Sequence, residues 1–267
     1  MGLFSKKQCD ICGGDIGLLG NRKLEDGNMC KNCAKLLSPW FSDRRRSTVD
    51  EIKAQLAYRE DNKSKVAAFR TTRILGDRTK VLLDEDAGVF MVTAERDLTA
   101  ANPDVIAFSD VTGCDLDIKE SRSEVRHSGP DGRQVSYNPP RFTYRYDFNL
   151  YINVRNPYFD EIHIKLNNSS VTIDTHGFGT VGGRYLDRAI GFDPERSPEY
   201  CKYRDMGEEI RDTLLYARQN ARSAFTASAP APAAPQVRSD TPWNCPACNG
   251  MNNGGRFCVN CGAPRQL

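Results

Sequence analysis

The chain has 267 residues, of which 39% are apolar and 27% charged, a composition that suits one ordinary domain with small accessory modules. Its 37 Lys and Arg nearly cancel its 35 Asp and Glu, leaving a net charge of +2, which argues against a dedicated nucleic-acid binder but not against a local basic patch. No segment reaches the roughly 18 consecutive apolar residues of a transmembrane helix, and the first residues do not form a secretory signal. We therefore expect a cytoplasmic protein.

The first predicted element is a cysteine-paired module. Two CxxC pairs, Cys9 with Cys12 and Cys30 with Cys33, are separated by seventeen residues. Glycine follows the first pair where a tight turn needs it, and Asp26-Gly27 predicts a hairpin just before the second pair. The sequence thus indicates a small finger that ends near residue 41.

A basic, polar hinge is expected after this module, at residues 42–46, and a helix at about 48–62. Thr48 and Glu51 form the pattern of a capping box, with apolar residues at helical spacing behind it. From about residue 72, apolar residues recur at every second position, as they do in strands. A hairpin is predicted there, with Val81–Leu83 and Val89–Thr93 as its strands and an Asp-rich, Gly-containing turn between them.

The clearest predicted strand covers residues 142–154. Apolar side chains occupy every second position of it, and mostly polar ones lie between them, as in a strand with one buried face. Shorter strands are expected around residues 114–118, 162–166 and 171–173. Their connections are mostly too short for crossover helices, so we expect antiparallel pairing.

The last regular element expected is a helix that begins after Ser197, with Pro198 at its first position. Its apolar residues recur every three or four positions and predict one face packed on the sheet. Residues 223–240 are rich in Ala and Pro and predict an extended linker. A second cysteine module follows, with Cys245 and Cys248 separated by nine residues from Cys258 and Cys261.

Eight of the ten cysteines therefore fall into four CxxC pairs. Without an export signal, reduced thiols that hold metal explain this pairing better than disulfides. Four thiolates complete the tetrahedral shell of zinc and leave no position for a reactive water. The pattern predicts two structural Zn²⁺ ions, one per module, in preference to redox-active pairs or iron–sulfur ligation.

Together these elements predict an α+β fold in five segments. The small zinc finger is followed by a helix, an antiparallel β-rich domain closed by a C-terminal helix, and a tethered zinc ribbon. The expected bounds are 1–41 for the N-terminal finger, 42–70 for the basic hinge and helix, 71–222 for the β domain with its helix, 223–242 for the Ala/Pro-rich linker, and 243–267 for the ribbon.

Three resemblances accompany this interpretation. The N-terminal module resembles a bacterial family of unknown function that is defined by such a module. The resemblance lies in Cys9-Asp10-Ile11-Cys12-Gly13, in Cys30-Lys31-Asn32-Cys33 and in the residues between them. It implies a cytosolic zinc-binding protein and no particular activity. The strand-rich middle, with Phe108-Ser109-Asp110-Val111, is similar to bacterial pleckstrin-homology-like domains. The C-terminal module resembles bacterial zinc ribbons, and its Trp243, Asn252 and Arg256 are similar to Ran-binding-type fingers, which bind RNA or ubiquitin; its spacing is one residue shorter than theirs.

No catalytic constellation is apparent in the sequence. The three histidines, His127, His163 and His176, lack a nucleophile in a recognisable motif, and His163 is expected on the solvent face of a strand. Cys114 is expected to be buried as a small apolar residue. Cys201 lies near a helix start, where a thiol can become reactive. The Gly-rich segment 176–184 lacks the ending of a phosphate-binding loop.

We therefore expect a non-enzymatic zinc-binding adaptor that contacts other proteins. One alternative is a nucleic-acid-binding zinc-finger protein, because the seventeen-residue spacing matches GATA-type fingers and Arg44, Arg45 and Arg46 follow closely. Another is a module that docks on a membrane surface through the pleckstrin-like middle.

Overall fold

The structure is a computed structural model and describes residues 7–174, 193–228, 242–253 and 258–263. The chain divides into two units, residues 1–223 and 224–267, and each is described by itself. The α+β class and the antiparallel sheets expected from the sequence are confirmed. In the described part of the chain, no helix has the length and apolar character to cross a membrane.

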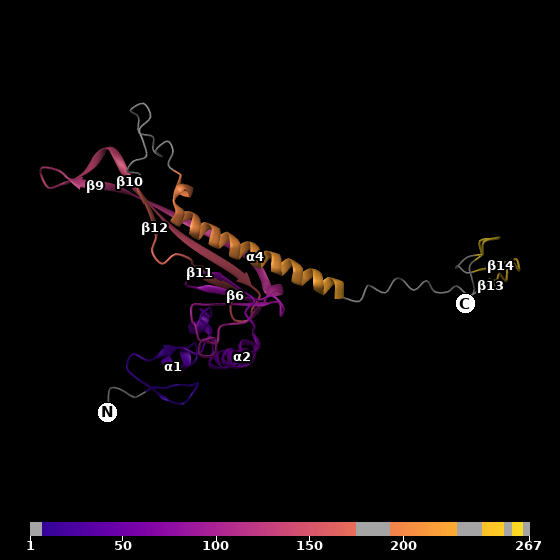
Figure 1. Cartoon of the computed structure of the whole chain (residues 1–267). Helices are drawn as coiled ribbons and strands as arrows, with labels where there is room; N and C mark the ends of the chain where they lie inside the picture. The colour runs from indigo at the N-terminus through magenta and orange to yellow at the C-terminus, as the bar shows by residue number, and fades with distance from the viewer. Residues whose placement is uncertain (1–6, 175–192, 229–241, 254–257, 264–267) are drawn as a thin grey trace. The chain divides into compact units, whose positions relative to one another are not determined.

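The N-terminal finger consists of two short hairpins and one helical turn (Figure 1). Strand β1 (Lys7–Gln8) pairs with β2 (Asp15–Ile16), β3 (Arg22–Lys23) pairs with β4 (Asn28–Met29), and α1 spans Lys31–Ala34. The predicted Asp26-Gly27 turn is confirmed, because it lies between β3 and β4 and the Leu24 N–H donates to the Gly27 carbonyl at 2.9 Å. Leu24 and Met29 are completely buried, and they anchor a core that belongs to the finger itself.

Helix α2 (Val49–Ala68) begins with the capping box that the sequence predicts. The Glu51 N–H donates to the Thr48 hydroxyl at 3.3 Å, and the Thr48 N–H donates to the Glu51 carboxylate at 2.8 Å. The helix continues to Ala68, beyond the expected end near residue 62. Its first turns complete the finger, since Ile52 is fully buried in the finger's core.

A buried polar network joins α2 to the loop after α3 (Leu98–Ala101). Arg59 of α2 forms an ion pair with Asp104 at 2.9 Å, and the two side chains are 7% and 0% exposed. The other Asp104 oxygen accepts from the Ser38 hydroxyl at 2.8 Å. One helix turn further, the Asn62 amide donates to Asn102 and its oxygen accepts from the Val105 N–H. The finger, α2 and the central domain are therefore fixed to one another.

The first sheet of the central domain has the order β5-β6-β7-β8 and is antiparallel throughout. Its strands are β5 (Arg73–Gly76), β6 (Lys80–Asp84), β7 (Val89–Thr93) and β8 (Ile106–Ala107). The β6–β7 hairpin confirms the one predicted from the Asp-rich turn. Phe108–Asp110 forms the short 3₁₀ helix η2, and the buried Phe108 ring stacks on the Phe90 ring with their centroids 6.1 Å apart.

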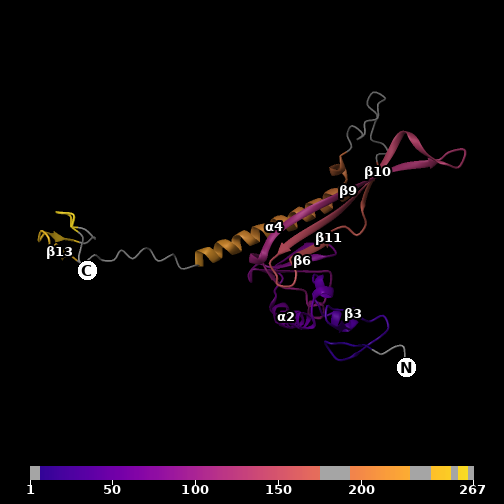
Figure 2. The ribbon, with the colours of Figure 1, turned by 180° about the vertical axis from the view of Figure 1, so that it is seen from behind.

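The second sheet is dominated by one long hairpin, β9 (Val111–Ser128) and β10 (Gln134–Val154). Two short strands, β11 (Glu161–Lys165) and β12 (Val171–Asp174), pair with successive parts of the other edge of β10. The strand predicted for 142–154 is confirmed and begins earlier than expected, so β9 and β10 project beyond the rest of the sheet as a two-stranded arm (Figures 1 and 2).

Helix α4 (Pro198–Ser228) lies along this second sheet, as both ribbon views show. The predicted seam makes the contact: Ile210 and Leu214 are fully buried, and the Tyr200 ring packs edge-on against Tyr146 and Phe148. The predicted cap is present, since the Tyr200 N–H donates to the Ser197 hydroxyl at 3.3 Å. The helix continues to Ser228, into the segment expected to be an extended linker, because Ala-containing segments readily form helix.

Candidate metal centres

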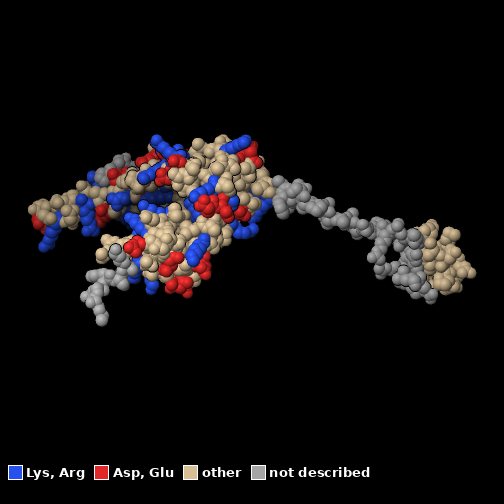
Figure 3. All heavy atoms as spheres, turned by 90° about the horizontal axis from the view of Figure 1, so that it is seen from below, with Lys and Arg blue, Asp and Glu red and all other residues tan. Residues whose placement is uncertain are grey.

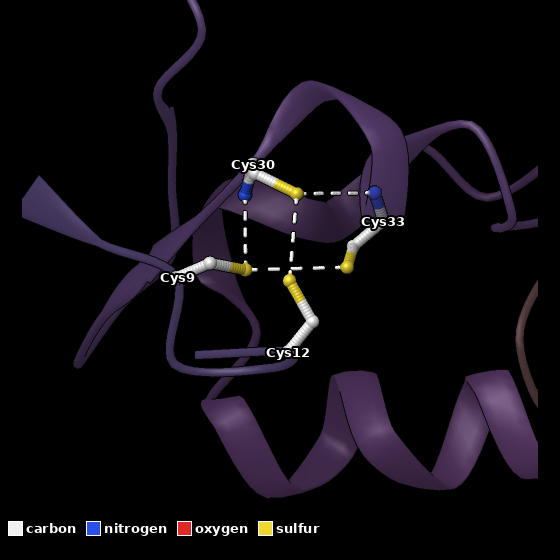
Figure 4. A group of neighbouring side chains, drawn as sticks. All are labelled: Cys9, Cys12, Cys30 and Cys33. Carbon is white, nitrogen blue, oxygen red and sulfur yellow. Dashed lines mark hydrogen bonds between the residues drawn. The ribbon is translucent and has the colours of Figure 1, made fainter. Parts of the chain in front are cut away.

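The first cysteine group lies where the β1–β2 turn meets the start of α1 (Figure 4). Cys9 and Cys12 come from that turn, Cys30 is the N-cap residue of α1, and Cys33 lies inside the helix. All four sulfurs lie within 4.8 Å of one another. The Sγ atoms of Cys9 and Cys33 are 4.0 Å apart, and those of Cys12 and Cys30 are 3.8 Å apart.

The second group lies in the C-terminal unit, beside the hairpin of β13 (Trp243–Asn244) and β14 (Met251–Asn252). Its Sγ–Sγ distances are 3.6 Å for Cys245 and Cys261 and 3.5 Å for Cys248 and Cys258. The structure therefore brings together all eight cysteines that the sequence singles out, in the two expected groups of four.

These distances fit a metal ion at the centre of each group. Around an ion with metal–sulfur bonds of about 2.3 Å, tetrahedral sulfurs lie about 3.8 Å apart. The observed separations of 3.5 to 4.0 Å bracket that value. A disulfide needs sulfurs about 2.05 Å apart, and all ten cysteines are free thiols. Each group can hold one metal ion with four thiolate ligands.

Three of the four CxxC turns share one backbone geometry. In each, the N–H of the first cysteine donates to the carbonyl five residues later: Cys9 to Gly14, Cys245 to Gly250 and Cys258 to Ala263, at 2.8 to 3.0 Å. In each, the N–H four residues after the first cysteine donates back to its carbonyl. That fourth residue has positive φ, 71° at Gly13, 51° at Asn249 and 74° at Gly262, and this explains the preference for glycine there.

The remaining pair, Cys30 and Cys33, is held by a helix start. The Cys33 N–H donates to the Cys30 sulfur at 3.4 Å, and the Cys30 N–H donates to the Cys9 sulfur at 3.2 Å. Backbone N–H groups directed at sulfur stabilise the thiolate, which is the form that binds metal. The first group is thus held by one turn and one helix N-terminus.

The thiol pKa values show why a cation suits these groups. Burial raises the pKa of Cys9, but hydrogen bonds from the backbone N–H groups of Cys12 and Cys30 outweigh it and bring the pKa to about 6. For Cys258, burial is likewise outweighed by backbone hydrogen bonds, and the pKa falls to about 6. Burial and the neighbouring thiols raise the pKa of Cys33. In the first group the Cys9 thiol therefore ionises more easily than the Cys33 thiol, because adjacent thiolates repel unless a cation lies between them.

Asn252 supports the second centre from within its own module. Its side chain is buried, its oxygen accepts from the Val259 N–H at 2.8 Å, and its amide donates to the Gly250 carbonyl at 3.1 Å. Asn252 therefore braces the two turns that carry the cysteines. Trp243 is part-buried in β13, and Arg256 lies outside the described residues.

The other candidates from the sequence lie apart from these centres. Cys114 is buried in the central core, and burial raises the pKa of its thiol to about 12. The Cys201 thiol donates to the Glu195 carbonyl at 2.8 Å. His163 is exposed, as expected, contacts the Asn149 side chain at 3.0 Å and stacks on Tyr151. His127 packs near Tyr137 on the arm. His176 and the Gly-rich segment 176–184 lie outside the described residues.

Residues 43–46, expected to be a hinge, form the 3₁₀ helix η1 (Asp43–Arg46) against the finger. The Arg44 guanidinium donates to the Lys23 carbonyl at 2.8 Å, while Arg46 pairs with Asp43 at 2.6 Å. Arg44 and Arg45 line a concavity beside β3. The contact between η1 and β3 spans about twenty residues of sequence, so no local pattern predicts it.

Comparison with protein families finds that residues 7–55 match a domain of unknown function, DUF4428. The match ends inside α2, beyond the end at residue 41 expected from the sequence. The structure gives a reason, because Ile52 fills the finger's core and the Val49 N–H donates to Asp26 at 2.8 Å. Comparisons with curated proteins and with solved structures find no match. The pleckstrin-like description of the middle therefore stays a prediction.

Proposed function

We propose that each cysteine group holds a structural Zn²⁺ ion and that the protein is a non-enzymatic adaptor whose zinc modules bind other proteins. The observation that carries the metal assignment is the closed set of four sulfurs at tetrahedral spacing in both groups. Four thiolates favour zinc among single divalent ions, and they leave no site for a metal-bound water. Such ions stabilise a fold and do not activate a substrate.

The metal assignment is tested by elemental analysis of the purified full-length chain. We expect two zinc ions per chain, and one in the variant Cys245→Ser/Cys258→Ser. Cys114→Ser is the matched control, because Cys114 is buried in the central core and belongs to neither group, and this variant should retain two. Cobalt substitution should give the intense sulfur-to-metal absorption of tetrahedral thiolate sites. Iron with labile sulfide, or fewer than two ions in the unmodified chain, would refute the assignment.

The adaptor function rests on how the two modules are mounted. The N-terminal finger is fixed to the central domain through α2 and the Arg59–Asp104 pair, whereas the second centre belongs to a separate unit. A binding module joined through a linker raises the effective concentration of its partner at the first module, so weak contacts add up. Within the described residues, the two cysteine groups are also the only clusters of His, Cys, Asp and Glu arranged to hold a metal.

The adaptor function is tested by crosslinking and pull-down from native lysate with the zinc-loaded full-length chain, with and without nuclease. We expect the chain to capture protein partners whether or not nuclease is present. The variant Cys245→Ser/Cys258→Ser should capture fewer of these partners. Capture of RNA or DNA that nuclease abolishes would favour the nucleic-acid alternative. A set of partners unchanged by the cysteine variant would remove the C-terminal module from the proposal.

A further inference from the structure

Two leucines project from the tip of the N-terminal finger. Leu18 and Leu19 are 93% and 91% exposed, and they lie between β2 and β3 in a tight turn in which the Gly20 N–H donates to the Gly17 carbonyl at 2.9 Å. The Arg22 guanidinium also donates to the Leu19 carbonyl at 3.4 Å. A single exposed leucine needs no explanation, but two adjacent ones held in an ordered turn form an apolar projection. We call this pair the leucine tip.

A basic concavity lies directly beside the leucine tip. Its volume is about 830 Å³, and residues of β3 and its flanks and of η1 line it: Asn21, Arg22, Lys23, Leu24, Glu25, Arg44 and Arg45. The lining therefore includes four cationic side chains and one carboxylate, that of Glu25. Over the face shown in Figure 3, basic and acidic side chains are intermixed, and the whole chain carries only +2. The concavity therefore carries a local excess of positive charge.

The cations of the concavity are held in place without being neutralised. Arg44 donates to the Lys23 carbonyl at 2.8 Å, and Arg22 donates to the Asn21 carbonyl at 3.2 Å. Within the described part of the chain, none of the four lining cations forms an ion pair, whereas the neighbouring Arg46 pairs with Asp43. Burial lowers the pKa of Arg44, and the charges of Arg45 and Arg22 lower it further. An anion in the concavity would relieve this repulsion.

We propose that the leucine tip and the basic concavity together dock the finger on an anionic membrane surface. The leucines enter the apolar boundary of the bilayer, and Arg22, Lys23, Arg44 and Arg45 contact lipid phosphates. Anionic membranes present phosphate and hydrocarbon within a few ångströms of each other, and surface-binding proteins combine apolar insertion with basic residues for that reason.

A nucleic acid would account for the cations but not for the leucines, and an apolar groove on a protein would account for the leucines but not for the cations. Arg22 links the two features, since its guanidinium contacts the Leu19 carbonyl and also lines the concavity. This surface belongs to the finger and is separate from the central domain. The proposal goes beyond the adaptor function and does not depend on which metal the cysteines hold.

The test is sedimentation of the full-length, metal-loaded chain with vesicles of phosphatidylcholine alone and with vesicles that also contain phosphatidylserine. We expect binding to the anionic vesicles only. The variant Leu18→Ser/Leu19→Ser should weaken it about tenfold or more, because two apolar side chains no longer enter the bilayer. Lys23→Gln/Arg45→Gln should weaken it about 25-fold, at roughly fivefold for each cation lost. Among the described residues, the side chains of both pairs form no hydrogen bond or ion pair, and Leu18 and Leu19 are almost fully exposed.

Two matched controls separate the site from general charge and apolarity. Arg46→Gln removes an adjacent arginine that lies outside the concavity, and Val259→Ser removes an exposed apolar side chain of the other unit; both should bind as the unmodified chain does. Metal content and circular dichroism of every variant should be unchanged. Absence of binding to anionic vesicles would overturn the proposal. So would binding that the leucine variant leaves intact, or tighter binding of DNA or RNA that depends on Lys23 and Arg45 alone.

Discussion

The buried ion pair between Arg59 and Asp104 provides the sharpest test of how the finger is attached to the central domain. The two side chains are 7% and 0% exposed and 2.9 Å apart. Asp104→Ala removes the only charge partner of Arg59 in the described residues and also the acceptor of the Ser38 hydroxyl. The guanidinium then remains buried without a counter-charge, and its Nε retains only the Leu36 carbonyl, at 3.3 Å.

Breaking a buried pair in this way costs about 3–5 kcal/mol, a large part of the stability of an ordinary domain. We expect a loss of that size in the free energy of unfolding, measured by chemical denaturation followed by circular dichroism in the presence of zinc. Asp43→Ala is the matched control. It breaks the Asp43–Arg46 pair, whose side chains are 60% and 84% exposed, and should cost less than about 1 kcal/mol.

The double variant Arg59→Met/Asp104→Leu distinguishes two causes of the destabilisation by Asp104→Ala, the unpaired buried charge of Arg59 and the lost packing. Replacing both charges by apolar groups should restore at least about 2 kcal/mol relative to Asp104→Ala. Equal losses for Asp104→Ala and Asp43→Ala would refute the reasoning. So would a double variant no more stable than Asp104→Ala, since the charge would then not be the cause.

Three further predictions follow from the packing and the thiols. Gly207→Leu should lower the unfolding free energy by about 1–3 kcal/mol in denaturant titrations, because even a Cβ there would lie 2.5 Å from Leu116. Cys114 should resist alkylation at pH 8 until the chain is unfolded, as mass spectrometry can show. Its folded pKa of about 12 exceeds the ordinary thiol value of 9.0, so this group's contribution to stability is complete below pH 9 and lost as the pH rises toward 12. Removal of metal from the second centre by a chelator should broaden the amide NMR signals around Cys245. The helical far-ultraviolet circular dichroism signal, to which α2 and α4 contribute, should persist.

Much of the fold is predictable because its signals are local. The Thr48 and Glu51 capping box, the turn before Cys30 and the alternation along β10 are each encoded within a few residues. The cysteine spacing likewise indicates both centres, since a CxxC turn directs two sulfurs to one point. These features have the same geometry in the structure as in the sequence-based interpretation.

What sequence reasoning missed depends on contacts between distant segments. Arg59 and Asp104 are 45 positions apart, and Arg59 looks like a solvated helix position until the fold brings them together. Ile52 lies in the helix that the sequence predicts, but its burial in the finger's core depends on Leu24 and Met29, which are more than about twenty positions away in the sequence. The same holds for Arg44, whose partner carbonyl at Lys23 lies 21 positions away.

The two metal centres therefore have the same donor chemistry but different support. The first is backed by a core that includes Leu24, Met29 and Ile52, and by α2 with its buried polar network. The described part of the second unit has two similar CxxC turns, a two-residue hairpin and Asn252. Because a module that small buries too little apolar surface to fold alone, a bound metal would have to supply most of its stability. At the first centre, a bound ion would instead act on a finger that its own core and α2 already support.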